Sequence, residues 1–534
     1  MTGWDGEISR RSLLVRASVG AAAISPLAAF LASCGGSGGG ASASASLDPL
    51  TWASSEPIES LSGRELGAAS IAGVRLGLEG LLTYDASGKL KPQLAESWNR
   101  PNPTTLVYKL RKGVTFWDGT PLTPADVVYT MEQQRDPSFK STQSLYYESI
   151  KTIAATGSDE VTITLSKPDV LAQYPAAITG IVSKKFWEAN AQEIGTPGTL
   201  TMGTGPWQFT DFNPNGHLDL KAFDGYWGGK PEIEKITMTV ISSDSSLLLA
   251  MRSGQVKGTF SVPIAHAEPW EALGNAAVTY APQLKSYFLA PNQTIEPWGD
   301  IHVRRALAHC VDKEGLLNAA FRGHGEAAPT IVAPQQWKVL VDETQIKDIY
   351  GRFPDLPFDV EAAKQELSQS SVPNGFSETL ECPSSEPELV QVAQAIAQSL
   401  SQIGVKLSVK EVPASQWEND LFSGTKGLQI AGFTPDLPDP ANLPRALLVS
   451  EGFANLAKYS DKQVDALLEK NAAETSPTGR AGTLAELLEI AGAAVAYVPI
   501  VYSQFGMAID NGLAYEELGP WYMYENWATK VHAA

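Results

Sequence analysis

A stretch in the second half of the chain has a residue spacing that by itself limits the fold class. Apolar residues recur there with the 3-4-4-3 spacing of a single helix face. Gly404 follows as a natural helix stop, and an alternating strand pattern covers residues 405–409. We therefore predict a helix, a glycine and a strand in sequence, which is one arm of an α/β fold. The positions that set the spacing are Leu389, Val392, Ile396, Leu400 and Ile403.

The first half of the chain is mixed and richer in strands. Alternating patterns predict strands at 161–165, 218–223 and 236–240, and a β-type run at 114–117 precedes an Asp-Gly turn. Thr123, followed by proline and Asp126, is typical of a helix start with a capping box. Asp359 is expected to cap a second helix. Strands and helices are thus expected throughout.

The N-terminal residues carry the features of an export signal. The letters SRRSLL at 9–14 resemble the twin-arginine export motif, and the apolar stretch at 17–31 is too short to span a bilayer comfortably. The letters LASC end at Cys34 and resemble a lipobox, in which cleavage precedes a lipidated cysteine. We predict a leader at 1–33, a lipid on Cys34 and a flexible Gly/Ser/Ala tether at 34–46.

The length and net charge of the chain after the leader limit its number of domains and its possible partners. Of 534 residues, 501 remain after a 33-residue leader, which is enough for two or three domains. No further apolar run is long enough to span a membrane. The net charge of −19 argues against nucleic acid, whose binding needs clustered Lys and Arg. Cys310 and Cys382 have neither metal nor redox spacing. One disulfide between them is possible in an oxidising compartment, but we expect two buried thiols.

Two carboxylates lie in a stiff, proline-rich loop after the apolar run at 428–432. The loop reads FTPDLPDPANLP at 433–444 and contains Asp436 and Asp439. The pair could serve acid/base chemistry, bind a metal, clamp a cationic ligand or only shape a turn. The chain has no HExxH and no GxSxG motif, and its six histidines are scattered. We therefore predict no catalytic residue, no metal site and no cofactor.

Several segments together resemble a known family of binding proteins. They are GLLTYD (80–85), PQLAESW (92–98), LRKGVTFWDGTPLT (110–123), ADVVY (125–129), GTGPW (203–207), YWGGKP (226–231), DIHVRRAL (300–307), VDK (311–313) and PDLPDP (435–440). In this order they resemble the extracytoplasmic solute-binding proteins of ABC importers, family 5, which includes the oligopeptide- and dipeptide-binding lipoproteins. The resemblance covers essentially the whole body after the tether. Most of these segments are expected to be structural, with Asp300 as a helix cap and Tyr226 and Trp227 in a core.

The resemblance implies a two-lobed α/β periplasmic-binding-protein fold of type II, similar to cluster C, with an extra subdomain inserted in lobe one. Lobe one would comprise residues 47–70, 201–288 and 504–534, with 71–200 as the insertion, and lobe two would comprise 289–503. Two crossovers would join the lobes, near 287–289 and 499–502, where the chain has apolar strand-like runs.

The resemblance also assigns candidate ligand-binding residues. In oligopeptide-binding relatives an aspartate of this loop pairs with the peptide's α-ammonium, and that role falls to Asp436. Asp439 is expected to turn the chain ahead of Ala441. The strand before the loop offers no arginine for a peptide carboxylate, and the nearest base is Lys426. The other candidate contacts are Phe433, Trp417, Trp52, Ser54 and Ser55.

The implied function is capture of a small solute by lobe closure and its delivery to an ABC permease. A peptide or another amine-bearing compound is the expected ligand, bound by a monomer that a lipid on Cys34 anchors to the outer face of the bacterial cell membrane. Two alternatives stay open. One is a receptor or sensor without a transport role, and the other is a non-peptide ligand such as an oligosaccharide, an opine or a nickel complex.

Overall fold

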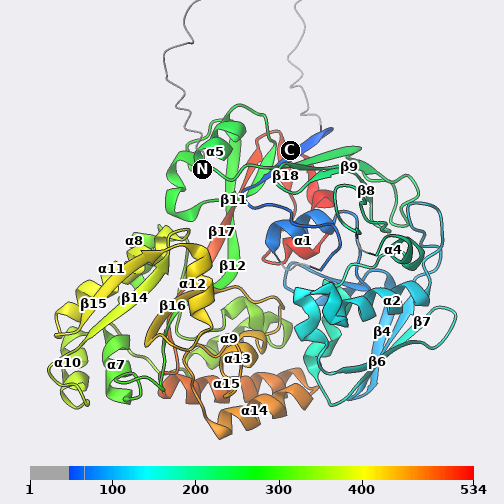
Figure 1. The fold of residues 1–534 in the computed structure, drawn as a ribbon. Coiled ribbons are helices and arrows are strands. Elements are labelled where there is room, and N and C mark those ends of the chain that lie inside the picture. Colours follow the sequence, from blue (N-terminus) through cyan, green and yellow to red (C-terminus); the bar gives the residue numbers. More distant parts are fainter. Residues whose placement is uncertain (1–46, 65–66, 192) are drawn as a thin grey trace, which may run out of the picture. The chain divides into compact units, whose positions relative to one another are not determined.

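A computed structural model of the protein describes residues 47–64, 67–191 and 193–534 (Figure 1). These residues belong to one compact unit, 45–534, and the description below concerns that unit alone. The expected leader (1–33), the lipidated Cys34 and the tether (34–46) lie outside the described residues. No helix within the described part of the chain is long and apolar enough to cross a membrane.

A nine-stranded mixed sheet organises the structure. Its strands follow the order β16-β12-β17-β11-β1-β10-β9-β8, and β13 also pairs with β17. Strand β1 is parallel to both of its neighbours, whereas the other pairs are antiparallel. The strands are β1 (Leu50–Ser54), β8 (Trp207–Asn213), β9 (His217–Ala222), β10 (Lys235–Val240), β11 (Gly258–Val262), β12 (Ala276–Pro291), β13 (Gly325–Ala327), β16 (Leu428–Phe433) and β17 (Val498–Asp510).

Strands β12 and β17 are long enough to belong to both halves of this sheet. The first half of β12 pairs with the end of β17, and its second half pairs with the start of β17 and with β16. Between these halves the register breaks, because Pro282 pairs with Gln504 but Ser286 already pairs with Tyr502. The runs expected as crossovers, 287–289 and 499–502, lie within these two strands. The lobe boundaries themselves stay a prediction.

A separate antiparallel sheet of four strands lies within residues 95–165. Its order is β4-β5-β7-β6, and helix α2 (Pro124–Arg135) packs on it. As predicted, α2 begins after Thr123, whose N–H and hydroxyl donate to the Asp126 carboxylate at 2.9 and 2.6 Å. The strand expected at 114–117 does not form, because Thr115 only makes a single bridge to Pro121 across the tight turn at Gly119. The strands are β4 (Ala95–Asn102), β5 (Thr105–Leu110), β6 (Ile150–Ala155) and β7 (Glu160–Leu165).

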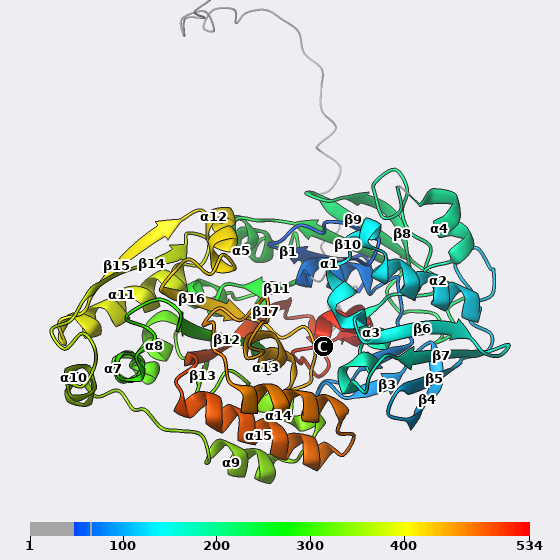
Figure 2. The same ribbon diagram turned by 60° about the horizontal axis from the view of Figure 1, so that its bottom comes forward.

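The predicted helix–glycine–strand unit is confirmed. Helix α11 (Pro387–Ser401) is followed by Gly404 at φ +85° and by β15 (Lys406–Val412), which pairs in parallel with β14 (Ser377–Pro383). In Figures 1 and 2 this unit and the four-stranded sheet lie on opposite sides of β12 and β17. Helix α10 (Val360–Ser368) starts at Asp359, as predicted, since the Asp359 carboxylate accepts two backbone N–H groups.

The remaining helices and short strands complete the layers around these sheets. The helices are α1 (Ala68–Val74), α3 (Pro175–Ile178), α4 (Lys184–Asn190), α5 (Asp244–Arg252), α6 (Glu268–Glu271), α7 (Ile301–His309), α8 (Lys313–Ala320), α9 (Glu343–Tyr350), α12 (Ala414–Leu421), α13 (Asn442–Leu447), α14 (Lys462–Ala473) and α15 (Pro477–Ala493). The short strands are β2 (Leu82–Tyr84), β3 (Leu90–Pro92), β18 (Leu513–Tyr515) and β19 (Val531–Ala533).

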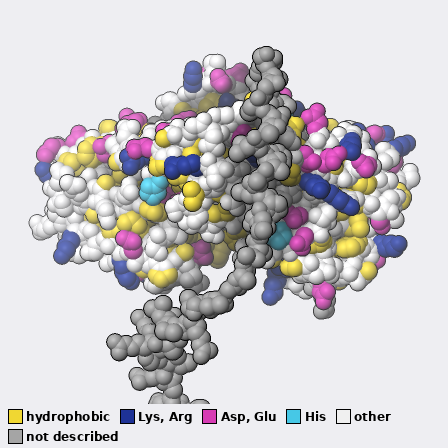
Figure 3. All heavy atoms as spheres, turned by 90° about the horizontal axis from the view of Figure 1, so that it is seen from above, with side chains coloured by type: hydrophobic (Ala, Val, Ile, Leu, Met, Phe, Trp, Pro, Cys, Tyr) yellow, Lys and Arg dark blue, Asp and Glu magenta, His cyan; other side chains and the backbone are white. Residues whose placement is uncertain are grey.

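Several smaller sequence predictions are also confirmed. Cys310 and Cys382 are buried free thiols, and burial raises the pKa of each to about 12. Asp300 caps α7 through the N–H of His302. Figure 3 shows acidic and basic side chains interspersed over the visible part of one face.

Candidate ligand-binding site

A cavity of about 550 Å³ lies where the parallel strands β1 and β11 end. Its wall comes from segments far apart in the sequence: the residues after β1, helix α1, the break in β12, the loop after β16, strand β17 and residues 520–524. Ligands of open α/β sheets commonly bind beyond the carboxyl ends of such strands. Its volume falls in the ordinary range for small-molecule sites.

Four of the six predicted ligand-binding residues line this cavity. They are Trp52, Ser54, Ser55 and Asp436. Trp52 is almost fully buried and packs against Phe260 and Trp527 with ring centroids 4.7 and 4.8 Å apart, so most of its ring belongs to the core.

Two serines of the cavity lining, Ser54 and Ser261, carry hydroxyls that can still bind a ligand. The Ser54 hydroxyl accepts the N–H of Glu56, and the hydroxyl of Ser261, another lining residue, accepts the N–H of Ser55, both at 3.2 Å. The hydroxyls of Ser54 and Ser261 donate no hydrogen bond to a described residue. Each therefore retains a donor for a ligand acceptor.

The other two predicted residues do not line the cavity. Phe433 meets Phe288 edge to face, with centroids 5.5 Å apart, and lies 6.4 Å from Phe422. Trp417 is half-buried on α12 and packs, like Phe433, against the same hydrophobic cluster. In this structure neither side chain forms part of the cavity wall.

Asp436 is held at the cavity by three separate segments. Its N–H donates to Asn442 (3.1 Å), its carboxylate accepts the Tyr146 hydroxyl (2.5 Å) and its carbonyl accepts the Tyr524 hydroxyl (3.4 Å). No cationic side chain of the described residues forms an ion pair with it. Burial raises the pKa of Asp436, and the hydrogen bond from Tyr146 partly opposes this. A carboxylate with one hydroxyl partner has further acceptor capacity for a ligand.

Asp439, three residues later, has a different environment. It is fully buried, and both its oxygens pair with Arg480 of α15, at 2.6 and 2.8 Å. The carboxylate also accepts the N–H of Ala441 at 3.0 Å, as expected for a residue that turns the chain. The two carboxylates of the loop therefore do not act as a pair. Asp439 is structural, and only Asp436 faces the ligand space.

The cavity carries more acidic than basic side chains. Glu56, Asp244 and Asp436 line it, against Lys285 as the only lysine, arginine or histidine among its described lining residues. Lys426, the base expected nearest to a ligand carboxylate, instead pairs with Glu381 (2.7 Å) and Asp420 (3.3 Å) and does not line the cavity. An acidic site favours a ligand with a cationic group.

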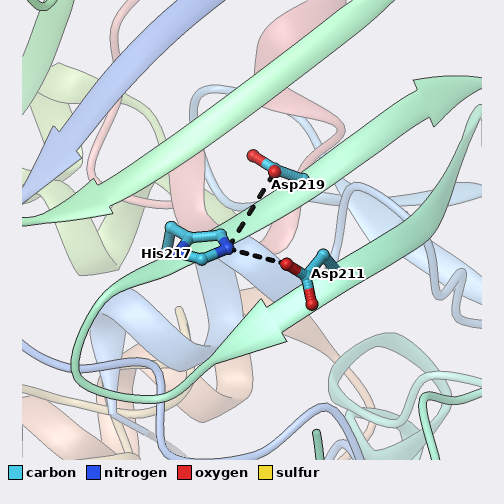
Figure 4. Close-up of side chains that lie close together, drawn as sticks. All are labelled: Asp211, His217 and Asp219. Carbon is cyan, nitrogen blue, oxygen red and sulfur yellow. Dashed lines mark hydrogen bonds and ion pairs between the residues drawn. The ribbon is translucent and has the colours of Figure 1, made fainter.

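One cluster of possible metal ligands occurs among the described residues, and it lies elsewhere. It consists of Asp211, His217 and Asp219 on the β8–β9 hairpin (Figure 4). His217 Nε2 is 3.0 Å from Asp211 and 3.9 Å from Asp219, and the Thr237 hydroxyl already donates to Asp219 at 2.7 Å. Ordinary pairing accounts for this partly exposed group, which belongs to no ligand cavity.

Comparison with known proteins agrees with this geometry. A model of the family described as bacterial extracellular solute-binding proteins, family 5 Middle, matches residues 89–455. The chain belongs to this family. The resemblance inferred from the sequence is thereby confirmed, and so is the interpretation of the protein as a solute-binding protein.

Individual relatives of this family 5 protein are distant but cover nearly the whole body. The glutathione-binding protein GsiB of Escherichia coli K12 is 26% identical over 452 residues, which are 82% of this chain and 85% of GsiB. The substrate-binding protein CtaP of Listeria monocytogenes superposes with a TM-score of 0.80 at 19% identity, covering 91% of this chain and 99% of CtaP. The oligopeptide-binding protein AppA of Bacillus subtilis, solved with a nonapeptide, superposes with a TM-score of 0.74 at 21% identity, covering 91% of this chain and 99% of AppA. These likenesses confirm the two-lobed α/β fold of the periplasmic binding proteins.

Proposed function

We propose that this family 5 protein captures an amine-bearing solute, most simply a peptide, and presents it to an ABC permease from the outer face of the cell membrane. The observation that carries the proposal is Asp436. It lies half-buried in an acidic cavity, with a tyrosine hydroxyl as its side-chain partner and no ion pair to a described residue. A ligand ammonium would supply the missing positive charge.

Burial makes this contact favourable for binding. A charge-assisted hydrogen bond between an ammonium and a carboxylate contributes about 1.5–3 kcal/mol. Prolines at 435 and 438 restrict the loop before the ligand arrives, so less conformational freedom is lost on binding. GsiB and AppA, which by name bind glutathione and oligopeptides, support a peptide as the ligand class.

The cavity wall draws on both of the lobes that we propose. Ser54 and Ser55 come from the segment 47–70, whereas Asp436 comes from 289–503. A ligand that contacts both segments stabilises the closed arrangement over the open one, which is the mechanism of capture by closure. The register break in β12, between Pro282 and Ser286, lies close to the boundary that we propose between the lobes.

Membrane attachment forms a further part of the proposal. The leader at 1–33 would direct export, Cys34 would carry the lipid, and the tether at 34–46 would let a monomeric body reach its permease. Labelling cells with a radioactive fatty acid tests this point. Incorporation into the protein but not into the Cys34→Ala variant is expected, and equal labelling of both would contradict the anchor.

The ligand class can be identified from the purified protein. We would purify the mature protein without refolding and record its native mass spectrum with fragmentation of bound species. Co-purified adducts that fragment into amino-acid residues are the expected result. Adducts with the mass of a sugar, an opine or a nickel complex, in the absence of peptides, would contradict the peptide assignment.

A further inference from the structure

Lys285 is the only basic side chain among the described residues that line the ligand cavity. It lies on β12 at the point where the register with β17 breaks. Between the paired residues Pro282 and Ser286 strand β12 advances four residues, while β17 advances only two, from Gln504 to Tyr502. Such a bulge redirects the side chains of the strand that carries it.

The backbone at the bulge adopts an unusual conformation. Leu284, next to Lys285, has φ +62°, a left-handed conformation that a branched residue rarely adopts. Its side chain is buried, whereas the side chains on either side of it, Gln283 and Lys285, reach the cavity wall. Strained backbone conformations of this kind persist where the surrounding structure enforces them, and they concentrate at functional sites.

Lys285 also lies beside the aspartate loop, which is the proline-rich segment 433–444 that contains Asp436 and Asp439. Ser286 pairs with Phe433 in the β12–β16 ladder, so Lys285 and Thr434 are the next residues beyond that pair. Thr434 and Asp436 both line the cavity with Lys285. The cavity wall thus contains a lysine from within β12 and a carboxylate from the loop that follows the paired strand β16.

The Lys285 ammonium is held in place and keeps unused donors. Its Nζ lies 2.7 Å from a carboxylate oxygen of Glu386 and 4.8 Å from the centroid of the Tyr287 ring. An ammonium has three N–H donors, and the Glu386 oxygen is its one hydrogen-bond acceptor among the described residues. The ion pair with Glu386 therefore orients the Lys285 ammonium and leaves N–H donors available for a ligand.

We infer that Lys285 binds the carboxylate of the ligand, so that the solute is a zwitterion whose ammonium pairs with Asp436 and whose carboxylate pairs with Lys285. This inference rests on the proposed function and narrows its ligand class. It assigns to the cavity a basic residue that binds the ligand carboxylate, which the sequence around the aspartate loop does not provide.

A set of alanine peptides of two to five residues tests the inference. Each peptide is used in four forms, with a free or acetylated amine and a free or amidated carboxyl group, and affinities for the mature protein are measured by calorimetry. The readout is the affinity ratio of the free-acid form to the amide form. For the wild type we expect a ratio of at least 10 for one or more peptide lengths.

Three variants separate a ligand contact from a structural ion pair. In Lys285→Met the acid-to-amide ratio should fall to within 3-fold of unity, while amide binding changes by less than 3-fold. In Glu386→Gln the ratio should be kept or increased, because the ammonium remains and its competing carboxylate is gone. Lys426→Met, which removes a lysine with two carboxylate partners outside the cavity, should leave the ratio unchanged.

Each outcome decides the matter. An unchanged ratio in Lys285→Met, or a ratio lost equally in Lys285→Met and Glu386→Gln, would overturn the assignment of Lys285 while peptide capture itself stands. Equal binding of acid and amide by the wild type would do the same. Failure of every peptide form to bind would overturn the proposed function and, with it, this inference.

Discussion

Glu79 shows how one buried side chain joins segments that the sequence presents separately. Its carboxylate is fully buried and accepts hydrogen bonds from the Thr204 hydroxyl (2.8 Å), the Tyr226 hydroxyl (2.9 Å) and the Trp227 indole N–H (3.0 Å). Tyr226 and Trp227, expected as core residues, are only half-buried, and their polar atoms serve Glu79. A tyrosine and a tryptophan in a sequence do not reveal whether their rings or their polar atoms matter, so this role could not be predicted.

Glu79 makes stability depend on pH. Burial raises the pKa of Glu79 from 4.5 to about 7 in the folded protein. The native state therefore binds more protons than the unfolded state between these values, and the contribution of this group to stability falls as pH rises through that window. The stability of the wild type relative to Glu79→Gln should therefore fall by on the order of 2 kcal/mol from pH 5 to pH 8. Urea unfolding of both proteins measures it, and parallel pH profiles would refute the role of Glu79.

Arg480 neutralises the buried carboxylate of Asp439. Because Arg480→Met leaves that carboxylate without its cation, we expect a loss of about 3–5 kcal/mol in the free energy of unfolding. Lys364→Met is the matched control, since its exposed pair with Glu361 should be worth less than about 1 kcal/mol. Equal losses for the two variants in denaturant unfolding would show that the Asp439–Arg480 pair is not structural.

At the scale of elements, regular patterns were predictable and local irregularities were not. Helix α11 and strand β15 follow from apolar spacing, and α2, α7 and α10 follow from capping residues, because these signals act within a few residues. The bulge in β12 has no comparable signal, since Leu284 is an ordinary apolar residue held at positive φ by its surroundings. Lys285 was missed for the same reason: it lies about 150 residues before Asp436 and meets the cavity only through the fold.

Gly432 of β16 supports the position of Lys285. A Cβ atom at this glycine would lie 2.5 Å from Cε of Lys285 and 2.6 Å from the Tyr287 ring. We expect Gly432→Ala to cost about 1–3 kcal/mol of stability by overpacking and to weaken binding of free-acid peptides more than of amides. Gly482→Ala in α15, whose Cβ would meet no atom within 4 Å, should be neutral or stabilising by up to about 1 kcal/mol. Thermal unfolding and calorimetry compare the two, and equal behaviour would contradict the packing argument.

At the scale of the molecule, three polar contacts join the aspartate loop and α13 to the segment 146–174. Tyr146 donates to Asp436, Tyr174 donates to Asp439 at 3.2 Å, and Arg445 binds both oxygens of Asp169 at 3.0 Å. By the domain boundaries that we propose, these contacts connect lobe two to the inserted subdomain, so they would stabilise the closed state. The sequence indicated the two-lobed fold through its family resemblance, but the contacts link residues 265 to 290 positions apart and had no local signal.

Removal of one of these contacts should act on ligand release. In Arg445→Gln the closed state loses its ion pair with Asp169, so we expect the ligand dissociation rate to rise by about 3- to 10-fold with little change in the association rate. Stopped-flow tryptophan fluorescence on peptide displacement measures both rates. An unchanged dissociation rate would show that the Arg445–Asp169 pair does not support closure.

The central claim is that Asp436 anchors the ligand's ammonium, and one calorimetric comparison tests it most directly. Wild type and Asp436→Asn, an almost isosteric removal of charge, are each titrated with a free-amine peptide and with its acetylated form. We predict that Asp436→Asn lowers affinity for the free amine by at least 10-fold and barely changes binding of the acetylated peptide. A loss of less than 3-fold for the free amine would contradict the claim.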